Sequence, residues 1–394
     1  MSLPVIGKKK GFSDMIYFDN SATTKPFPEV VDSFVKVSSD FFGNPSSIHR
    51  LGVEAESLLT QARKQIGELL QVNPSEVYFT SGGTESNNLA IKGTALMFRN
   101  RGKHIITSAV EHASVREAYQ QLKELGFRIT VIPVDAEGRV SVSEIEDAIC
   151  HDTILVSIMH VNNEVGTIQP IEEIGDLLKD YSKILFHVDY VQGVGKVALD
   201  IQKHHIDLCS MSAHKFHGLK GTGVLVVREG VEISPLFSGG NQEWKLRSGT
   251  ENVAGAVSMA KALRLTLQSY ETKVSQLLEV QNYLFKELQT LEDVVIHTPS
   301  RGQAPHIINF SIKGFRGEVF VHALEEKGLI VSTTSACSSK KKAVSHTLLA
   351  MNVSKDVAES AIRMSLSYEN TLEEAKKAIS IIQTTVTELR EVMH

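Results

Sequence analysis

Between about Ser75 and Val227, short runs of β-branched residues alternate with amphipathic stretches. This alternation is typical of βα units, in which crossover helices cover a mostly parallel sheet. The runs lie at 77–80, 104–108, 129–133, 154–161, 184–188, 208–211 and 224–227. The sequence therefore predicts an α/β fold with a mostly parallel seven-stranded sheet.

The pattern changes after Thr250, where a long helical stretch reaches about Leu291. Strand-like runs at 294–297 and 307–312 follow, and then a helix at 372–393 with a capping box at Thr371 and Glu374. The length of 394 residues is two to three times that of a usual domain. We predict a large domain at 26–255, a smaller α+β domain made of 15–25 and 256–394, and an N-terminal extension at 1–14.

Composition excludes several classes of function. The formal net charge of −5 offers no positive field for a phosphodiester backbone, and no apolar run approaches membrane-spanning length. Cys150, Cys209 and Cys337 form no C-x-x-C pair, so neither a disulfide framework nor a zinc ribbon is indicated. We expect a cytoplasmic protein with no nucleic-acid or membrane partner and no resident metal.

A glycine-rich turn follows the first run of the sheet. Ser81-Gly82-Gly83-Thr84 leads from that strand into an apolar helical stretch, where backbone N–H groups at a helix start can bind phosphate. The turn matches neither the dinucleotide fingerprint nor a Walker loop. Alone, it would be more typical of a capped turn.

Two further strand ends carry charged side chains. The run at 184–188 ends in Asp189, and the run at 208–211 leads to Lys215, at the positions where open α/β sheets place ligand groups. Pyridoxal phosphate needs an amine for a Schiff base, a carboxylate for its ring nitrogen and a phosphate cradle. Singly, each feature is more often structural, but their joint occurrence favours this cofactor.

Nine motifs make the comparison specific: 18–24, 43–47, 80–87, 111–112, 160–164, 187–189, 212–215, 247–253 and 335–339. With these motifs the chain resembles the cysteine desulfurases of the NifS/IscS type, from Tyr17 to the C-terminal helix. That family has the fold type I of pyridoxal-phosphate enzymes, so the resemblance implies this fold and cofactor.

The resemblance also implies roles for matching residues. Lys215 would form the Schiff base, His112 would stack on the ring and move protons, and Asp189 would pair with the ring nitrogen. The other implied cofactor contacts are Gln192 at the ring oxygen, Gly83, Thr84, Ser212 and His214 at the phosphate, and Asn163.

Three more residues matter for the substrate and for assembly. Arg363 matches the arginine that binds the substrate carboxylate, with Asn44 as its helper. Thr250 is expected to reach the phosphate of a second subunit. This last role implies a homodimer.

Cys337 is predicted to be the catalytic thiol. Its neighbours are polar and lysines 340–342 follow, a setting that favours the nucleophilic thiolate. The resemblance implies that Cys337 takes sulfur from L-cysteine as a persulfide, leaving L-alanine. The acceptor would be an iron–sulfur scaffold or a tRNA-thiolation enzyme, and Cys337 itself could ligate an iron–sulfur cluster transiently.

Two other functions stay open at this point. A selenocysteine lyase or an aminotransferase would use the same fold, and an aminotransferase would not need Cys337. A sulfur-relay scaffold without catalytic activity is less favoured, because every charged catalytic position of the family is occupied.

Overall fold

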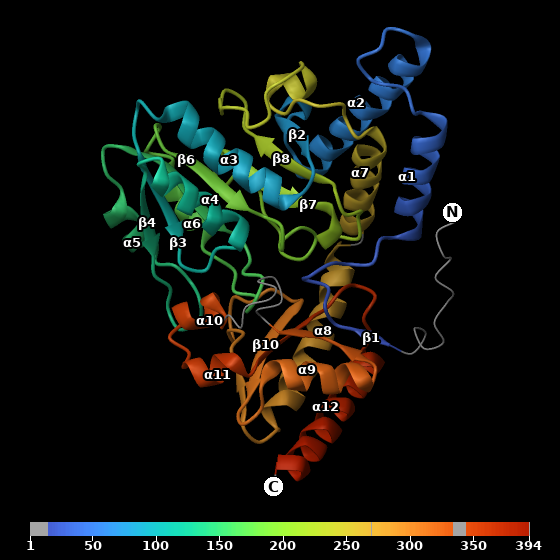
Figure 1. Ribbon diagram of the computed structural model, residues 1–394, viewed down its shortest axis with the longest axis vertical. Helices are drawn as coiled ribbons and strands as arrows, with labels where there is room; N and C mark the ends of the chain where they lie inside the picture. Colours follow the sequence, from blue (N-terminus) through green and yellow to red (C-terminus); the bar gives the residue numbers. More distant parts are fainter. Residues whose placement is uncertain (1–14, 269, 334–343, 394) are drawn as a thin grey trace.

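The computed structural model describes residues 15–268, 270–333 and 344–393. Its largest sheet has the strand order β2-β8-β7-β6-β5-β3-β4 (Figure 1). These strands are β2 (Val77–Thr80), β3 (His104–Ser108), β4 (Arg128–Ile132), β5 (Thr153–Met159), β6 (Leu185–Asp189), β7 (Leu208–Ser212) and β8 (Gly223–Val227). Strand β8 is antiparallel to both of its neighbours, β2 and β7, and the other four pairs are parallel, so the predicted seven-stranded, mostly parallel sheet is confirmed.

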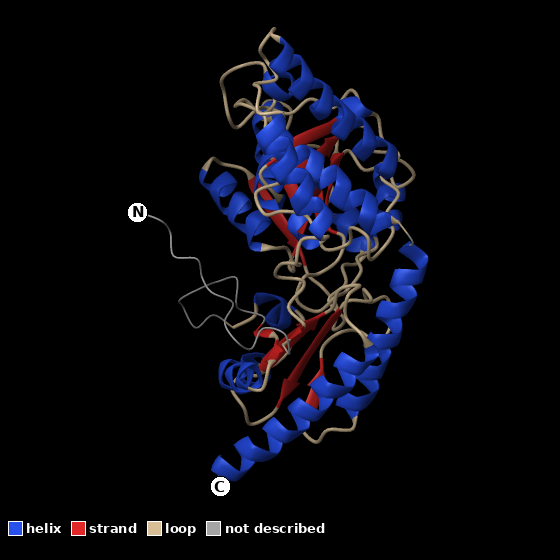
Figure 2. Ribbon diagram, turned by 90° about the vertical axis from the view of Figure 1, so that its right-hand side faces the viewer, coloured by secondary structure: helices blue, strands red, loops and turns tan. Residues whose placement is uncertain are grey.

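Helices cover both faces of this sheet (Figure 2). Ile105 and Leu155 pack with α3 (Gly83–Phe98) and α4 (Ala113–Glu124). Their neighbours Ile106 and Val156 point the other way, because side chains alternate along a strand. The opposite face packs against α2 (Arg50–Leu70), α5 (Val142–Ala148), α6 (Ile171–Leu178) and α7 (Val253–Leu267). Burial on both faces explains why the strands read as continuous apolar runs.

A second, four-stranded sheet has the order β12-β13-β10-β9 and lies in the lower part of Figure 1. Its strands are β9 (Val294–Ile296), β10 (Ile307–Ile312), β12 (Ser332–Thr333) and β13 (Ala361–Ser365). Around it lie α8 (Tyr270–Gln289), α9 (Gly317–Glu326), α10 (His346–Ala350), α11 (Lys355–Glu359) and α12 (Leu372–Met393). The N-terminal β1 (Ile16–Tyr17) pairs with β11 (Leu329–Ile330), which joins the start of the chain to this unit.

The long helical stretch predicted after Thr250 is two helices, α7 and α8. Gln268, with φ −64° and ψ 126°, takes the backbone out of the helical region at the end of α7. In contrast, α12 matches its predicted bounds, and its capping box is formed. The Thr371 N–H donates to Glu374 Oε2 at 2.8 Å, and the Glu374 N–H donates to Thr371 Oγ1 at 3.2 Å.

Each unit has a large hydrophobic cluster, and Leu348, Met351 and Ala358 of the smaller unit pack into the cluster of the seven-stranded sheet. Residues of β1, α8, α9, β10, β13 and α12 form one cluster, which holds no residue of the seven-stranded sheet. The boundary proposed at residue 255 lies inside α7, which packs on α2 and on α1 (Pro28–Asp40). We therefore propose the same two domains with the boundary at the end of α7. No helix among the described residues is long and apolar enough to cross a membrane.

Candidate active site

A cavity of about 260 Å³ opens at the carboxyl ends of the parallel strands. Open α/β sheets bind ligands at this edge, because the loops that leave neighbouring strands converge there. Ten of the residues predicted from the sequence line this one cavity: Gly83, Thr84, His112, Asn163, Asp189, Gln192, Ser212, His214, Lys215 and Arg363. The structure thus brings together groups that are up to 280 positions apart in the chain.

Lys215 stands one short turn beyond β7. The strand ends at Ser212, and the 3-10 turn Ala213–Lys215 follows it directly. The Lys215 ammonium donates to the backbone carbonyls of Ser21 and Ala22, the latter at 2.8 Å. These contacts hold the amine at the cavity wall.

Asp189 is the last residue of β6, and its side chain is buried. Its Oδ2 accepts from Asn87 Nδ2 at 2.7 Å, and its Oδ1 accepts from the Val191 N–H at 3.0 Å. Nearby, burial raises the pKa of Glu111 to about 8, which favours the protonated form of this second carboxyl. Asp189, and not Glu111, lines the cavity.

The turn before α3 is shaped by close packing of backbone. Gly82 has φ +149°, and a Cβ placed on Gly223 would lie 2.5 Å from the Gly82 Cα. A Cβ on Gly83 would lie 2.7 Å from Val191 Cγ2. These glycines leave the first N–H groups of α3 at the cavity, where a helix start favours an anion.

His112 caps α4 and its ring lines the cavity. Ring Nδ1 accepts from the Ser114 N–H at 3.1 Å, which fixes the ring plane. Burial, with Lys215 and Arg116 nearby, lowers the pKa of His112. Burial and Lys215 likewise lower the pKa of His214 to about 4. Both rings are therefore neutral at neutral pH.

Arg363 reaches the same cavity from β13 of the second sheet. Its guanidinium donates to the Asn163 carbonyl at 2.9 Å, to Asp19 Oδ1 at 3.0 Å and to Ser332 Oγ at 2.9 Å. The Arg363 Nε is buried and has no hydrogen-bond partner among the described residues. A buried cation with an unused donor is suited to receive an anionic ligand.

The segment 19–24 touches both halves of the site. Asp19 pairs with Arg363, while the Ser21 carbonyl accepts from Gln192 Nε2 at 3.0 Å and from Lys215. Thr24 Oγ1 donates to the His214 carbonyl at 2.9 Å. One stretch of chain therefore connects the arginine of the small sheet to the lysine of the large one.

Three predicted residues lie elsewhere. Thr250 and Asn44 are exposed and do not line the cavity of this single chain. Cys337 lies outside the described residues. The roles predicted for these three residues remain predictions.

Sequence reasoning missed other polar groups around the cavity. Asn87 lies one helical turn after Gly83, and this spacing of four puts both residues on one face of α3. Buried Lys196 donates to the Lys215 carbonyl at 2.7 Å, and burial lowers the pKa of Lys196 to about 7. Asp19 lies in the motif 18–24, but no role was predicted for it. Its ion pair with Arg363 joins residues from opposite ends of the chain, so no local pattern indicates it.

The residues present fit pyridoxal phosphate. Asn87 Oδ1 and Gln192 Oε1 are buried without a hydrogen-bond partner among the described residues, so both amides have bonding capacity left for a ligand. Asp189 is placed for a protonated ring nitrogen, and the start of α3 with Ser212 and His214 for a phosphate. Lys215 supplies the amine that the aldehyde requires.

Comparison with known proteins agrees with this geometry. The family model described as aminotransferase class-V matches residues 16–377. The chain belongs to the aminotransferase class-V family. A relative, a NifS/IcsS protein homolog of Lactobacillus delbrueckii subsp. bulgaricus, is 49% identical over 382 residues, covering 96% of this chain and 99% of the relative.

Two further proteins make the comparison more specific. A cysteine desulfurase IscS of Dictyoglomus turgidum is 42% identical over 378 residues, covering 96% of each protein. A solved structure titled NifS-like protein superimposes with a TM-score of 0.89 at 38% identity, covering 95% of this chain and 99% of that one. The predicted NifS/IscS resemblance, the type I fold and pyridoxal 5'-phosphate as the enzyme's cofactor are confirmed.

Proposed function

We propose that this class-V enzyme converts L-cysteine to L-alanine and holds the released sulfur as a persulfide on Cys337. The observation that carries the proposal is that Lys215 and Arg363 line one cavity. An amino acid needs an amine-binding cofactor at one end and a cation for its carboxylate at the other. The names of the relatives above, together with these two groups, support cysteine desulfuration.

When bound, pyridoxal phosphate supplies an electron sink for the substrate carbon that loses a proton. Lys215 would hold the cofactor and, once released from it, move the proton at the substrate Cα. Asp189 would keep the ring nitrogen protonated, since its carboxylate is buried and already fixed by two N–H donors. Arg363 would orient the substrate carboxylate, because it lines the cavity and its Nε–H is an unused donor among the described residues.

The sulfur step balances without an added oxidant. The Cys337 thiolate attacks the substrate sulfur, the carbon–sulfur bond breaks, and the carbon takes up a proton to become the methyl group of alanine. One thiol plus L-cysteine thus gives one persulfide plus L-alanine. The proposed acceptor is an iron–sulfur scaffold protein or a tRNA-thiolation enzyme.

The proposed assembly is a homodimer in the cytoplasm. Exposed Thr250 supports the dimer, because its predicted phosphate contact is not made within this chain. The free thiols of Cys150 and Cys209 support a reducing compartment. Size-exclusion chromatography with light scattering measures the assembly directly.

The test is turnover of L-cysteine by the purified holoenzyme in the presence of a thiol reductant. Alanine and sulfide should form in equal amounts. A keto acid in place of alanine would identify an aminotransferase, and turnover of L-selenocysteine but not L-cysteine would identify a selenocysteine lyase. Labelled sulfur, followed in parallel to a scaffold protein and to a tRNA-thiolation enzyme, names the acceptor.

Replacing Arg363 with lysine is expected to raise the KM for L-cysteine by roughly ten- to a hundredfold. Lysine keeps the charge but loses the planar fork that grips both carboxylate oxygens. Steady-state kinetics provide the measurement, and Arg316→Lys at an exposed position is the matched control. An unchanged KM in Arg363→Lys would remove Arg363 from substrate binding.

A further inference from the structure

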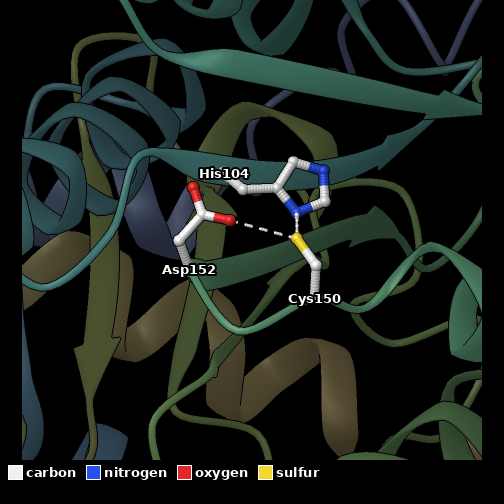
Figure 3. Close-up of side chains that lie close together, drawn as sticks. All are labelled: His104, Cys150 and Asp152. Carbon is white, nitrogen blue, oxygen red and sulfur yellow. Dashed lines mark hydrogen bonds between the residues drawn. The ribbon is translucent and has the colours of Figure 1, made fainter.

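A second group of reactive side chains lies at the opposite edge of the large sheet from the cavity. His104 opens β3, and Cys150 and Asp152 lie in the loop that leads into β5 (Figure 3). In the described part of the chain, this is the group of His, Cys and acidic residues whose three ligand atoms all lie within 4.8 Å of one another. The site is distinct from the active site, because parallel strands begin at the edge opposite to the one where they end.

We propose that His104, Cys150 and Asp152 form a binding site for a thiophilic divalent transition-metal cation of the Zn²⁺ class. Thiolate, imidazole and carboxylate are the three ligand types that zinc takes from proteins. Calcium and magnesium prefer oxygen ligands, so a site that contains a thiolate selects against them. The fourth position would be taken by water.

The distances between donor atoms are close to those that a metal requires. Cys150 Sγ lies 3.0 Å from His104 Nδ1 and 3.2 Å from Asp152 Oδ1. Around a tetrahedral zinc ion, a sulfur and a nitrogen or oxygen ligand are separated by about 3.6 Å. The ion therefore fits when each of these two distances increases by about half an ångström, through movement of the Cys150 and Asp152 side chains in the surface loop.

The surroundings of His104 support this assignment. The ring is fully buried, and its other nitrogen, Nε2, is 2.8 Å from Thr130 Oγ1. Metal-binding histidines are almost always held by such an outer partner, which fixes the ring with its ligating nitrogen toward the ion. Cys150 and Asp152 are partly exposed, so an ion from solvent can reach the site.

Two further side chains also contact these donors. The Arg128 guanidinium donates to Asp152 Oδ1 at 2.8 Å and to Cys150 Sγ at 3.3 Å. Thr153 Oγ1 lies 2.7 Å from His104 Nδ1, and this contact is replaced when the ion binds. Because Arg128 is cationic and largely exposed, it opposes the ion and can swing away into solvent.

No local sequence motif indicates this site. His104 and Cys150 are 46 positions apart, and parallel pairing of β3 with β5 is what brings them together. A C-x-x-C search detects only ligands that are close in the chain.

The test uses Co²⁺ as a spectroscopic probe for zinc. Holoenzyme carrying Cys337→Ser, which removes the other predicted reactive thiol, is titrated with Co²⁺. We expect one equivalent to give the visible d–d bands of a tetrahedral thiolate complex, displaced by Zn²⁺. Adding Cys150→Ser should weaken the affinity by at least about tenfold, and Thr130→Val by roughly tenfold through the loss of the outer partner.

Arg128→Gln leaves the three proposed ligands in place, so Co²⁺ binding can still be measured if a ligand variant fails to fold. Removing the positive charge should tighten Co²⁺ binding by roughly fivefold or more. Zn²⁺ should also raise the Tm of the parent protein but not of its Cys150→Ser derivative. The proposal is overturned if the parent gives no tetrahedral spectrum, if the spectrum survives Cys150→Ser, or if Arg128→Gln weakens binding. None of these outcomes depends on desulfurase activity.

Discussion

Replacement of Cys337 by serine is expected to lower sulfide release from L-cysteine by at least about a thousandfold. A serine hydroxyl cannot attack a thiol sulfur to form a persulfide, so the carbon–sulfur bond is not broken by this route. None of the proposed cofactor contacts is assigned to Cys337, so the visible absorption of the holoenzyme should be retained. Sulfide release, alanine formation and the absorption spectrum are the three measurements.

Ser380→Ala provides the control, because it changes one small polar side chain at an exposed position of α12. This control should keep the parental rate of alanine formation. Continued desulfuration by Cys337→Ser would contradict the role of Cys337 as the nucleophile and would favour the alternative function, a selenocysteine lyase. Intact proteins trapped after a single turnover and weighed by mass spectrometry should carry one extra sulfur in the parent and none in Cys337→Ser.

Lys215→Ala is expected to abolish both turnover and the covalent attachment of the cofactor. The variant loses the amine that condenses with the aldehyde and the base that moves the Cα proton, a loss of at least about a thousandfold in rate. Lys215→Arg keeps the positive charge without that reactivity, so it should be equally inactive. Absorption of the purified protein and borohydride trapping followed by peptide mass analysis measure the attachment.

Lys220 is exposed and lies five positions after Lys215, so it is the control for loss of a nearby charge. Lys220→Ala should retain both the covalent cofactor and turnover. If borohydride trapped the cofactor on a lysine other than 215 in the parent protein, the assignment of the cofactor site would be wrong. Persistent turnover in Lys215→Ala would lead to the same conclusion.

The sheet could be predicted from the sequence because five of its strands, β3, β5, β6, β7 and β8, are buried along their whole length. The predicted run 104–108 has the same bounds as β3, and the predicted run 208–211 ends one residue before β7 does. Apolar runs of this length, separated by helical periodicity, leave few alternatives. The break at Gln268 was missed, because apolar periodicity continues across it and the change lies in one backbone angle.

Much of the site was also predictable, since the ends of parallel strands meet at one edge. That rule joins Asp189 to Lys215 without any coordinates. The same rule does not predict Arg363, because this residue comes from the second sheet. Its role was predicted from the family resemblance. Contacts set by domain packing, such as Asp19 with Arg363, depend on which loops meet across the two units and leave no local pattern in the sequence.

The segment 19–24 has a mechanical consequence. It is anchored at one end to the guanidinium of Arg363 and at the other to the ammonium of Lys215 and the backbone at His214. Any displacement of Asp19 that accompanies binding of a carboxylate at Arg363 would therefore act on the backbone carbonyls that hold the Lys215 ammonium. Trimming the chain from its amino end past Asp19 would cut that linkage, and it would also remove Ile16 and Phe18 from the hydrophobic core of the smaller unit.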